Sequence, residues 1–131
     1  MLYVGRSVRA TPAAAWQLIS STDTWSSWGP SVSGVDPPDA SIFAGMRGRV
    51  RVPLGAWLPF TITVCEAPRV WAWSVLGLPA TRHEVHPAPG GCRVRFGVPV
   101  GAPAYLLVCR VALDRIASML ESGQDAAEVR R

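Results

Sequence analysis

Apolar and polar residues alternate through much of the chain, with the period of two that is typical of strands buried on one face. The connections within the stretch that follows residue 52 are too short for crossover helices, so neighbouring strands there must be antiparallel. The pattern predicts strands over Leu2–Arg9, Met46–Val52, Trp57–Glu66, Arg69–Leu76, Thr81–Pro87 and Cys92–Val98.

Two short helices are predicted between the first strand and the rest. Thr11 is a suitable N-cap, and Pro12 suits the first helical position because its missing N–H has no helical partner there. Asp23 is expected to cap the second helix. That helix carries Trp25 and Trp28, which are three residues apart and therefore lie on one side of it.

A long C-terminal helix is predicted over 102–122, with Gly123 ending it and residues 123–131 forming a flexible tail. Three leucines widen its apolar face toward another element or a second subunit, so a homodimer is one option: Leu106, Leu113 and Leu120. The main apolar stripe recurs at helical spacing: Tyr105, Val108, Ala112, Ile116 and Met119.

This order of elements predicts one α+β domain over residues 1–131. The long helix needs a large apolar surface to cover its stripe, and the inner face of a curved antiparallel sheet is the one that the sequence offers. We therefore expect the sheet to wrap around the long helix.

The alternation also predicts which residues lie opposite one another, since a slip of one residue would turn every side chain over. Closing the hairpins with turns at Ala67-Pro68, GLP and APGG and a five-residue loop after Val52 gives one row across five strands, which we expect to form the floor of a cavity: Gly48, Ile62, Trp73, His83 and Phe96. Trp71 is then expected opposite Val64 and Val85, as packing that closes one end. Cys65 and Glu84 are assigned to the outer face.

Composition narrows the class of protein. The net charge is +4, but every basic residue is arginine, and the arginines alternate along strands as expected for a solvent-exposed face. No nucleic-acid motif accompanies this charge, so nucleic-acid binding is not expected.

The three cysteines have no metal-ligand spacing, which predicts neither a disulfide framework nor a metal site. The longest apolar run, AYLLVC, is too short to span or insert stably into a membrane, so we expect a cytoplasmic protein.

Several segments together resemble a known family, over about Val4 to Glu121. They are ATPAAAWQLIS, then DTWSSWGPSV, then LPFTITVCEAPRVWAWSVLGLPATRHEVHPAPGGCRVRF, and finally YLLVCRVALDRIASMLE. Their order resembles the START-like, helix-grip superfamily, in its branch of small polyketide cyclase/dehydrase and lipid-transport (SRPBCC) proteins. The chain departs from some relatives at Gly29, where they carry an asparagine before the proline.

The resemblance implies a seven-stranded antiparallel sheet that grips the C-terminal helix, with a short second strand near Ser31 to Val35. It also implies a deep apolar cavity, because relatives bind lipids, sterols, polyketides or hormones and some catalyse cyclisation. No cofactor is implied. The expected partner is a small apolar molecule, and the fold is shared far more widely than any one chemistry.

His83 is the leading candidate for chemistry, because an inward histidine can shuttle protons near neutral pH. A cyclase could use it as general acid and base. It could also orient a ligand, or be a core histidine bonded to a backbone carbonyl or to Tyr105. His86 is three residues further along the strand and faces the other way, so the two histidines cannot share a metal.

Four other side chains have open interpretations. The Tyr105 hydroxyl could donate to a ligand carbonyl or satisfy a buried acceptor. An inward Arg6 could receive a carboxylate. Trp25 and Trp28 could pack the short helix on the sheet or gate the cavity mouth.

The expected function is binding of a small, largely apolar ligand, such as a lipid or polyketide, between sheet and helix. A polyketide aromatase/cyclase that uses His83 is the first alternative, and a co-chaperone-like protein-interaction module is the second. The predicted ligand-binding residues are Trp73, His83, Phe96, Ile62, Tyr105, Val108 and Ala112, with His83 also as the candidate catalytic residue.

Overall fold

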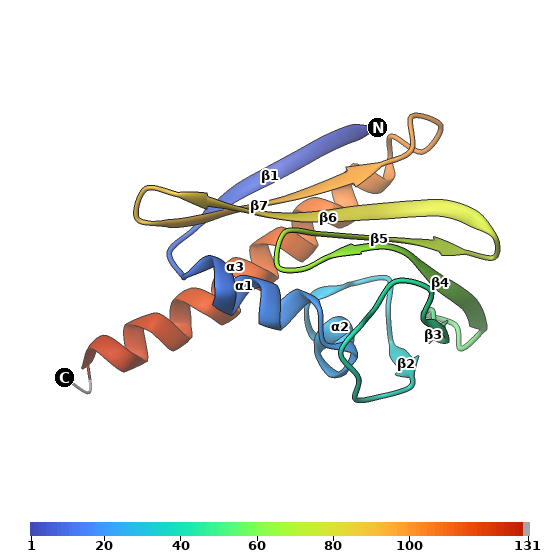
Figure 1. Ribbon diagram of the computed structural model, residues 1–131, viewed down its shortest axis with the longest axis horizontal. Helices are drawn as coiled ribbons and strands as arrows, with labels where there is room; N and C mark the ends of the chain where they lie inside the picture. The colour runs from blue at the N-terminus through green and yellow to red at the C-terminus, as the bar shows by residue number, and fades with distance from the viewer. Residues whose placement is uncertain (130–131) are drawn as a thin grey trace.

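Seven strands form one antiparallel sheet in the order β1-β7-β6-β5-β4-β3-β2, in a computed structural model that describes residues 1–129 (Figure 1). This confirms the predicted α+β helix-grip architecture, including the short second strand. The strands are β1 (Leu2–Val8), β2 (Gly34–Asp36), β3 (Arg47–Arg51), β4 (Trp57–Glu66), β5 (Val70–Val75), β6 (Leu78–Ala88) and β7 (Gly91–Val98).

The segment between β1 and β2 is helical, as predicted. The Thr11 Oγ1 accepts a hydrogen bond from the Ala14 N–H at 3.1 Å, which confirms the N-cap. Asp23 is not a cap. It lies inside a 3₁₀ turn, and Thr24 precedes the next helix with its hydroxyl bonded to backbone carbonyls instead. These elements are α1 (Pro12–Ile19), η1 (Thr22–Thr24) and α2 (Trp25–Trp28).

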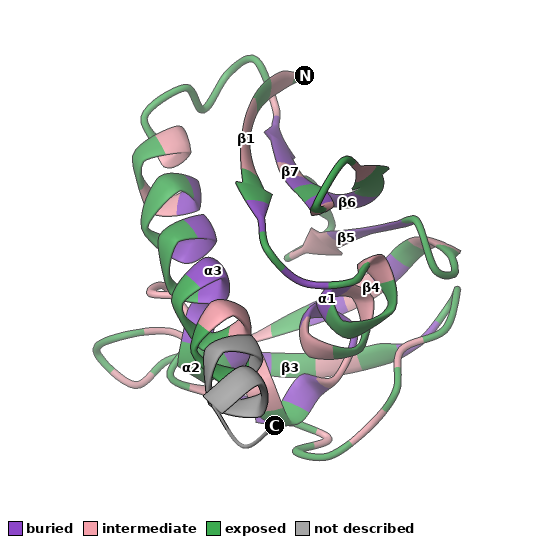
Figure 2. Ribbon diagram, turned by 90° about the vertical axis from the view of Figure 1, so that its left-hand side faces the viewer, coloured by how far each residue is buried: buried purple, intermediate pink, exposed green. Residues whose placement is uncertain are grey.

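The long helix, α3 (Tyr105–Val129), starts later and ends later than predicted. The helix runs through Gly123, because a glycine inside a helix costs only about 1 kcal/mol relative to alanine and does not oblige it to stop. The segment predicted to be a flexible tail, residues 123–131, belongs to α3 as far as Val129. Its last two residues, 130 and 131, lie outside the described part of the chain. Figure 2 shows the buried side of α3 turned toward the sheet and its exposed side turned away.

The three leucines that were expected to widen the apolar face of α3 do not form a free face. Leu113 is buried, and Leu106 and Leu120 pack half-buried against the core, which removes the observation that pointed to a second subunit. No helix in residues 1–129 has the length and hydropathy to cross a bilayer. The exposed large apolar residues in the part of α3 whose side chains are described are Leu107, Val111 and Met119.

Two of the four predicted registers are confirmed. His83 lies opposite Phe96 across β6 and β7, and Ile62 lies opposite Trp73 across β4 and β5. A bulge follows Ile62 on β4 and changes which face the next residues share. Cys65 therefore packs against the core, where alternation alone had placed it outside.

The β5–β6 register differs by two residues from the prediction. The hairpin turns at Leu76 and Gly77, whose φ angles are 55° and 74°, so β6 begins immediately at Leu78. A two-residue turn with positive φ at both positions matches the twist of a hairpin, and a bulge follows between Ala72 and Ser74. As a result Trp71, not Trp73, lies opposite His83.

The β3–β4 register is also shifted by two residues, with Gly48 opposite Phe60 rather than Ile62. Both shifts keep each side chain on its predicted face, because the period of a strand is two. The predicted floor row is therefore wrong in two of its four contacts. Gly48 is tightly covered there: a Cβ would lie 2.6 Å from Phe60 Cζ and 2.5 Å from the Asp36 carbonyl oxygen.

Replacing Gly48 with alanine should lower the free energy of unfolding by about 1–3 kcal/mol, because the added methyl group forces the Phe60 ring or the β2 backbone to move. Urea unfolding monitored by circular dichroism measures this. Gly101→Ala is the matched control, since nothing lies within 4 Å of a Cβ there. Equal stability of the two variants would contradict the tight packing of Gly48.

Candidate functional site

A cluster of aromatic side chains fills the space between α2 and the inner face of the sheet. Trp71 stacks on His83 with ring centres 3.7 Å apart and on Trp25 with ring centres 5.0 Å apart. Trp25 and Trp28 are 1% and 5% exposed. Their burial favours the interpretation that they pack the short helix on the sheet, rather than gate a mouth.

A continuous chain of hydrogen bonds links four strand residues of this cluster. The Trp73 Nε1–H donates to Thr81 Oγ1 at 2.8 Å, and Thr81 Oγ1 lies 3.1 Å from His83 Nε2. His83 Nδ1 lies 3.2 Å from the backbone carbonyl oxygen of Trp71. Since a carbonyl only accepts, His83 Nδ1 carries the proton and donates it. His83 Nε2 then accepts from the Thr81 hydroxyl, and both ring nitrogens are occupied.

Burial lowers the pKa of His83 from its ordinary 6.5 to about 3, although the hydrogen bond to the Trp71 carbonyl opposes the shift. The imidazole is therefore neutral at physiological pH. This arrangement matches the core histidine bonded to a backbone carbonyl, and the partner is Trp71 rather than Tyr105. A base with so low a pKa and no free lone pair is poorly suited to proton abstraction at neutral pH.

Two compartments lie beside this cluster. The inner compartment has a volume of about 30 Å³ and is bounded by the aromatic cluster together with α3 residues. The outer compartment has a volume of about 310 Å³, within the range of small-molecule sites. Its walls are mainly aliphatic and proline side chains from β3 to β7 and the following loop: Val50, Val52, Leu58, Val75, Pro79, Ala80, Val98, Pro99 and Ala102.

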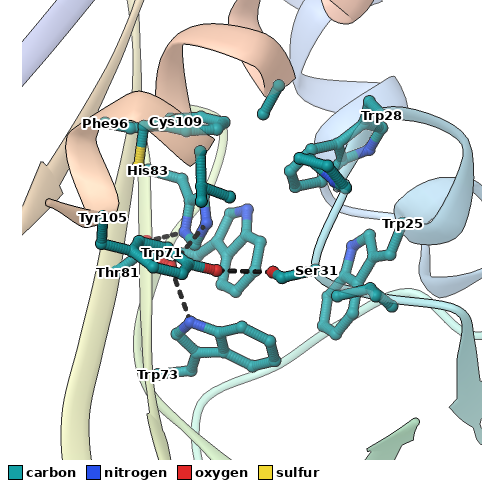
Figure 3. A pocket seen from close by; sticks show the side chains of 15 residues that line it. Trp25, Trp28, Ser31, Trp71, Trp73, Thr81, His83, Phe96, Tyr105 and Cys109 are labelled. Carbon is teal, nitrogen blue, oxygen red and sulfur yellow. Dashed lines mark hydrogen bonds between the residues drawn. The ribbon is translucent and has the colours of Figure 1, made fainter. Parts of the chain in front are cut away.

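The compartments are adjacent, because they share five lining residues: Ser31, Val32, Trp73, Thr81 and Tyr105. Tyr105 Oη on α3 and Ser31 Oγ on the loop after α2 lie 2.6 Å apart and form a hydrogen bond. Figure 3 shows this bond crossing the pocket between the side that carries Trp73, Thr81 and His83 and the side that carries Trp25 and Trp28. Burial raises the pKa of Tyr105 above 10, so its hydroxyl keeps its proton.

The structure brings six of the seven predicted ligand-binding residues to the compartments. Trp73 and Tyr105 line both, and the inner compartment is also lined by His83, Phe96, Val108 and Ala112. Ile62 is fully buried in the core and lines neither compartment. Arg6 is not aimed into them: it pairs with Asp114 on α3.

Sequence reasoning missed most of the outer compartment and two of its polar residues. Ser31, Pro99 and Ala102 lie in loops that carry no periodic signal. Thr81 was assigned to the inner face, yet its link between Trp73 and His83 depends on the shifted register. Among the described residues, no three His, Cys, Asp or Glu side chains come together as a metal site.

His83 should make the free energy of unfolding depend on pH. The unfolded imidazole takes up a proton near pH 6.5, whereas folding keeps the pKa near 3. The stabilising contribution is therefore complete above pH 6.5 and is lost as pH falls from 6.5 toward 3. Urea unfolding at pH 7.5 and 5.5 should show a loss of about 1.4 kcal/mol from this group.

The His83→Gln variant should lack this loss, whereas His86→Gln should retain it, since half-exposed His86 bonds to Glu84 on the other face. A loss that persists in His83→Gln would contradict the assignment. If that variant does not fold, nuclear magnetic resonance of the wild-type ring decides. Carbon shifts of His83 that stay constant from pH 7.5 to 5.5 support the buried neutral state, and a midpoint near 6.5 contradicts it.

Comparison with solved structures supports the fold. A protein from Mesorhizobium loti aligns with a TM-score of 0.73 at 13% identity, covering 92% of this chain and 96% of its own. A protein from Staphylococcus saprophyticus aligns with a TM-score of 0.71 at 15% identity, covering 92% and 91%. A third, from Nitrosomonas europaea, has a TM-score of 0.69 at 13% identity and covers 95% and 96%. At such identities the likeness concerns the fold alone.

No functionally curated protein matched the chain. A family model described as polyketide cyclase / dehydrase and lipid transport matches residues 2–128, nearly the whole sequence. The matched range includes every strand and both compartments. The chain belongs to the polyketide cyclase / dehydrase and lipid transport family.

Proposed function

We propose that this protein binds a small, largely apolar molecule in the outer compartment. One observation carries the proposal: a pocket of about 310 Å³ is lined mainly by aliphatic and proline side chains and has polar groups chiefly at its inner end. Burying the apolar body of a ligand there would contribute about 25 cal/mol per Å² of apolar surface. Membership of the family supports the same function.

The inner end of the compartment supplies the polar contacts that orient a ligand. Ser31, Thr81 and Tyr105 carry hydroxyl groups on the boundary between the two compartments. A few placed polar groups in an otherwise apolar pocket are the usual arrangement of such sites. The bound molecule would then lie with its polar end inward and its apolar part between β3, β5 and the β7–α3 loop.

The two alternative functions have less support. Cyclisation with His83 as acid and base would need a free ring nitrogen, whereas both are hydrogen-bonded. An interaction module like that of co-chaperone-like relatives was expected to use the exposed side of the leucine stripe, and Leu106, Leu113 and Leu120 pack on the core. Binding without a proton-transfer role for His83 is therefore the function that we propose.

Filling the outer compartment should abolish binding. Val75→Trp adds a large ring to its wall, so we expect the affinity for the neutral fluorescent probe N-phenylnaphthylamine to fall by about tenfold or more. Val111→Trp makes the same exchange on the exposed side of α3 and should leave affinity unchanged. Fluorescence titration measures both. Equal affinities, or no uptake by the wild type, would contradict the proposed site.

A further inference from the structure

The Trp71 indole N–H is a buried donor with no hydrogen-bond partner among the described residues. Trp71 is 1% exposed and lines the inner compartment. The other tryptophans that line it are satisfied: Trp25 donates to Ile19 O at 3.0 Å, and Trp28 donates to the Thr24 hydroxyl at 3.3 Å. Trp73 donates to Thr81. Leaving a buried donor unpaired costs about 1–3 kcal/mol, so this N–H favours an acceptor beside it.

None of the other polar groups described in the inner compartment accepts a hydrogen bond from this indole N–H. Both ring nitrogens of His83 and the proton of Thr81 are used within the chain of hydrogen bonds. In the pair formed by Tyr105 and Ser31, one hydroxyl donates to the other, which leaves one O–H proton spare. The donors that stay unused at this site are the Trp71 indole N–H and one hydroxyl proton, beside the spare lone pairs of the two hydroxyl oxygens.

The absence of charged side chains from the lining limits the chemical class of acceptor that could bind there. None of the described residues that line either compartment carries a charged side chain. A carboxylate placed there would lose its hydration without meeting a cation, which costs several kcal/mol. A neutral carbonyl oxygen accepts hydrogen bonds at a far smaller cost of desolvation.

The volumes of the two compartments suit a ligand that has a carbonyl oxygen at one end and a hydrocarbon part attached to it. The inner compartment of about 30 Å³ is the size of one water molecule, and so of one oxygen atom. The outer compartment can hold the hydrocarbon part. Tyr105 and Ser31 line both compartments, so their hydrogen bond lies on the boundary that an entering oxygen crosses.

We infer that the ligand is a neutral apolar molecule with a carbonyl group, whose oxygen enters the inner compartment and accepts a hydrogen bond from the Trp71 indole N–H. This inference rests on the proposed function, because it assigns the chemistry of the group that the same site recognises. Trp71 is the specificity residue for the carbonyl, and the outer compartment binds the chain attached to it.

The test compares decyl methyl ketone with undecanoate at pH 8, because the two differ only in a methyl group against a charged oxygen. Displacement of N-phenylnaphthylamine gives the affinity of each. We expect the ketone to bind at least tenfold more tightly. In Trp71→Phe the ratio of ketone affinity to probe affinity should fall by about tenfold, the loss of one hydrogen bond. Trp16→Phe, which lines neither compartment, is the matched control.

A measurement on the wild-type protein keeps the inference testable if Trp71→Phe does not fold. The chain has six tryptophans, so Trp71 can be identified by eliminating the other five indole resonances with single Trp→Phe variants. The Trp71 indole proton should move downfield with the ketone and not with undecanoate. Equal affinity for the two ligands, or ketone binding without this shift, overturns the inference and leaves the proposed function standing. No uptake of probe or ketone overturns both.

Discussion

A neutral histidine can remain in an apolar core only when both of its ring nitrogens have partners, and this requirement organises the centre of the molecule. The Trp71 carbonyl meets one nitrogen and Thr81 meets the other. Thr81 in turn holds the Trp73 indole, which lies on the boundary between the two compartments. The pairing of β5 with β6 is irregular beside Trp73, where Ala80 and Thr81 of β6 lie opposite that one residue. The shape of the pocket therefore follows from how one buried imidazole is satisfied.

The family supplies a sheet and a helix, and the side chains between them decide what is bound. Three solved structures share this fold at 13–15% identity, which leaves nearly every wall position free to differ. In this chain the aromatic cluster occupies most of the inner space and leaves room for about one atom beside His83. The larger volume lies further out, under the β7–α3 loop. The shared fold therefore does not determine which ligand this chain binds.

Six of the strands, the antiparallel neighbours from β3 to β7 and the facing of most of their residues could be predicted from the sequence, because alternation has a period of two and reports the face directly. Alternation cannot detect a slip of two residues. Both register errors were of this kind, at Gly48 and at Trp73. The turn at Leu76 carries a positive φ that its residue type does not suggest, and bulges leave no pattern in a single sequence. The loop residues of the outer compartment have no periodicity, so only the tertiary structure places Ser31 and Pro99 beside the strands.

The near-parallel stacking of Trp25 on Trp71 also has an optical consequence. Their rings are inclined by 5° with centres 5.0 Å apart, close enough for their electronic transitions to couple. Coupled indoles give a paired signal in the far-ultraviolet circular dichroism that separated indoles lack. Trp25 belongs to α2 and Trp71 to β5, so the contribution of this pair depends on whether the short helix is docked on the sheet. Circular dichroism of the unlabelled protein is therefore sensitive to how α2 packs on the sheet.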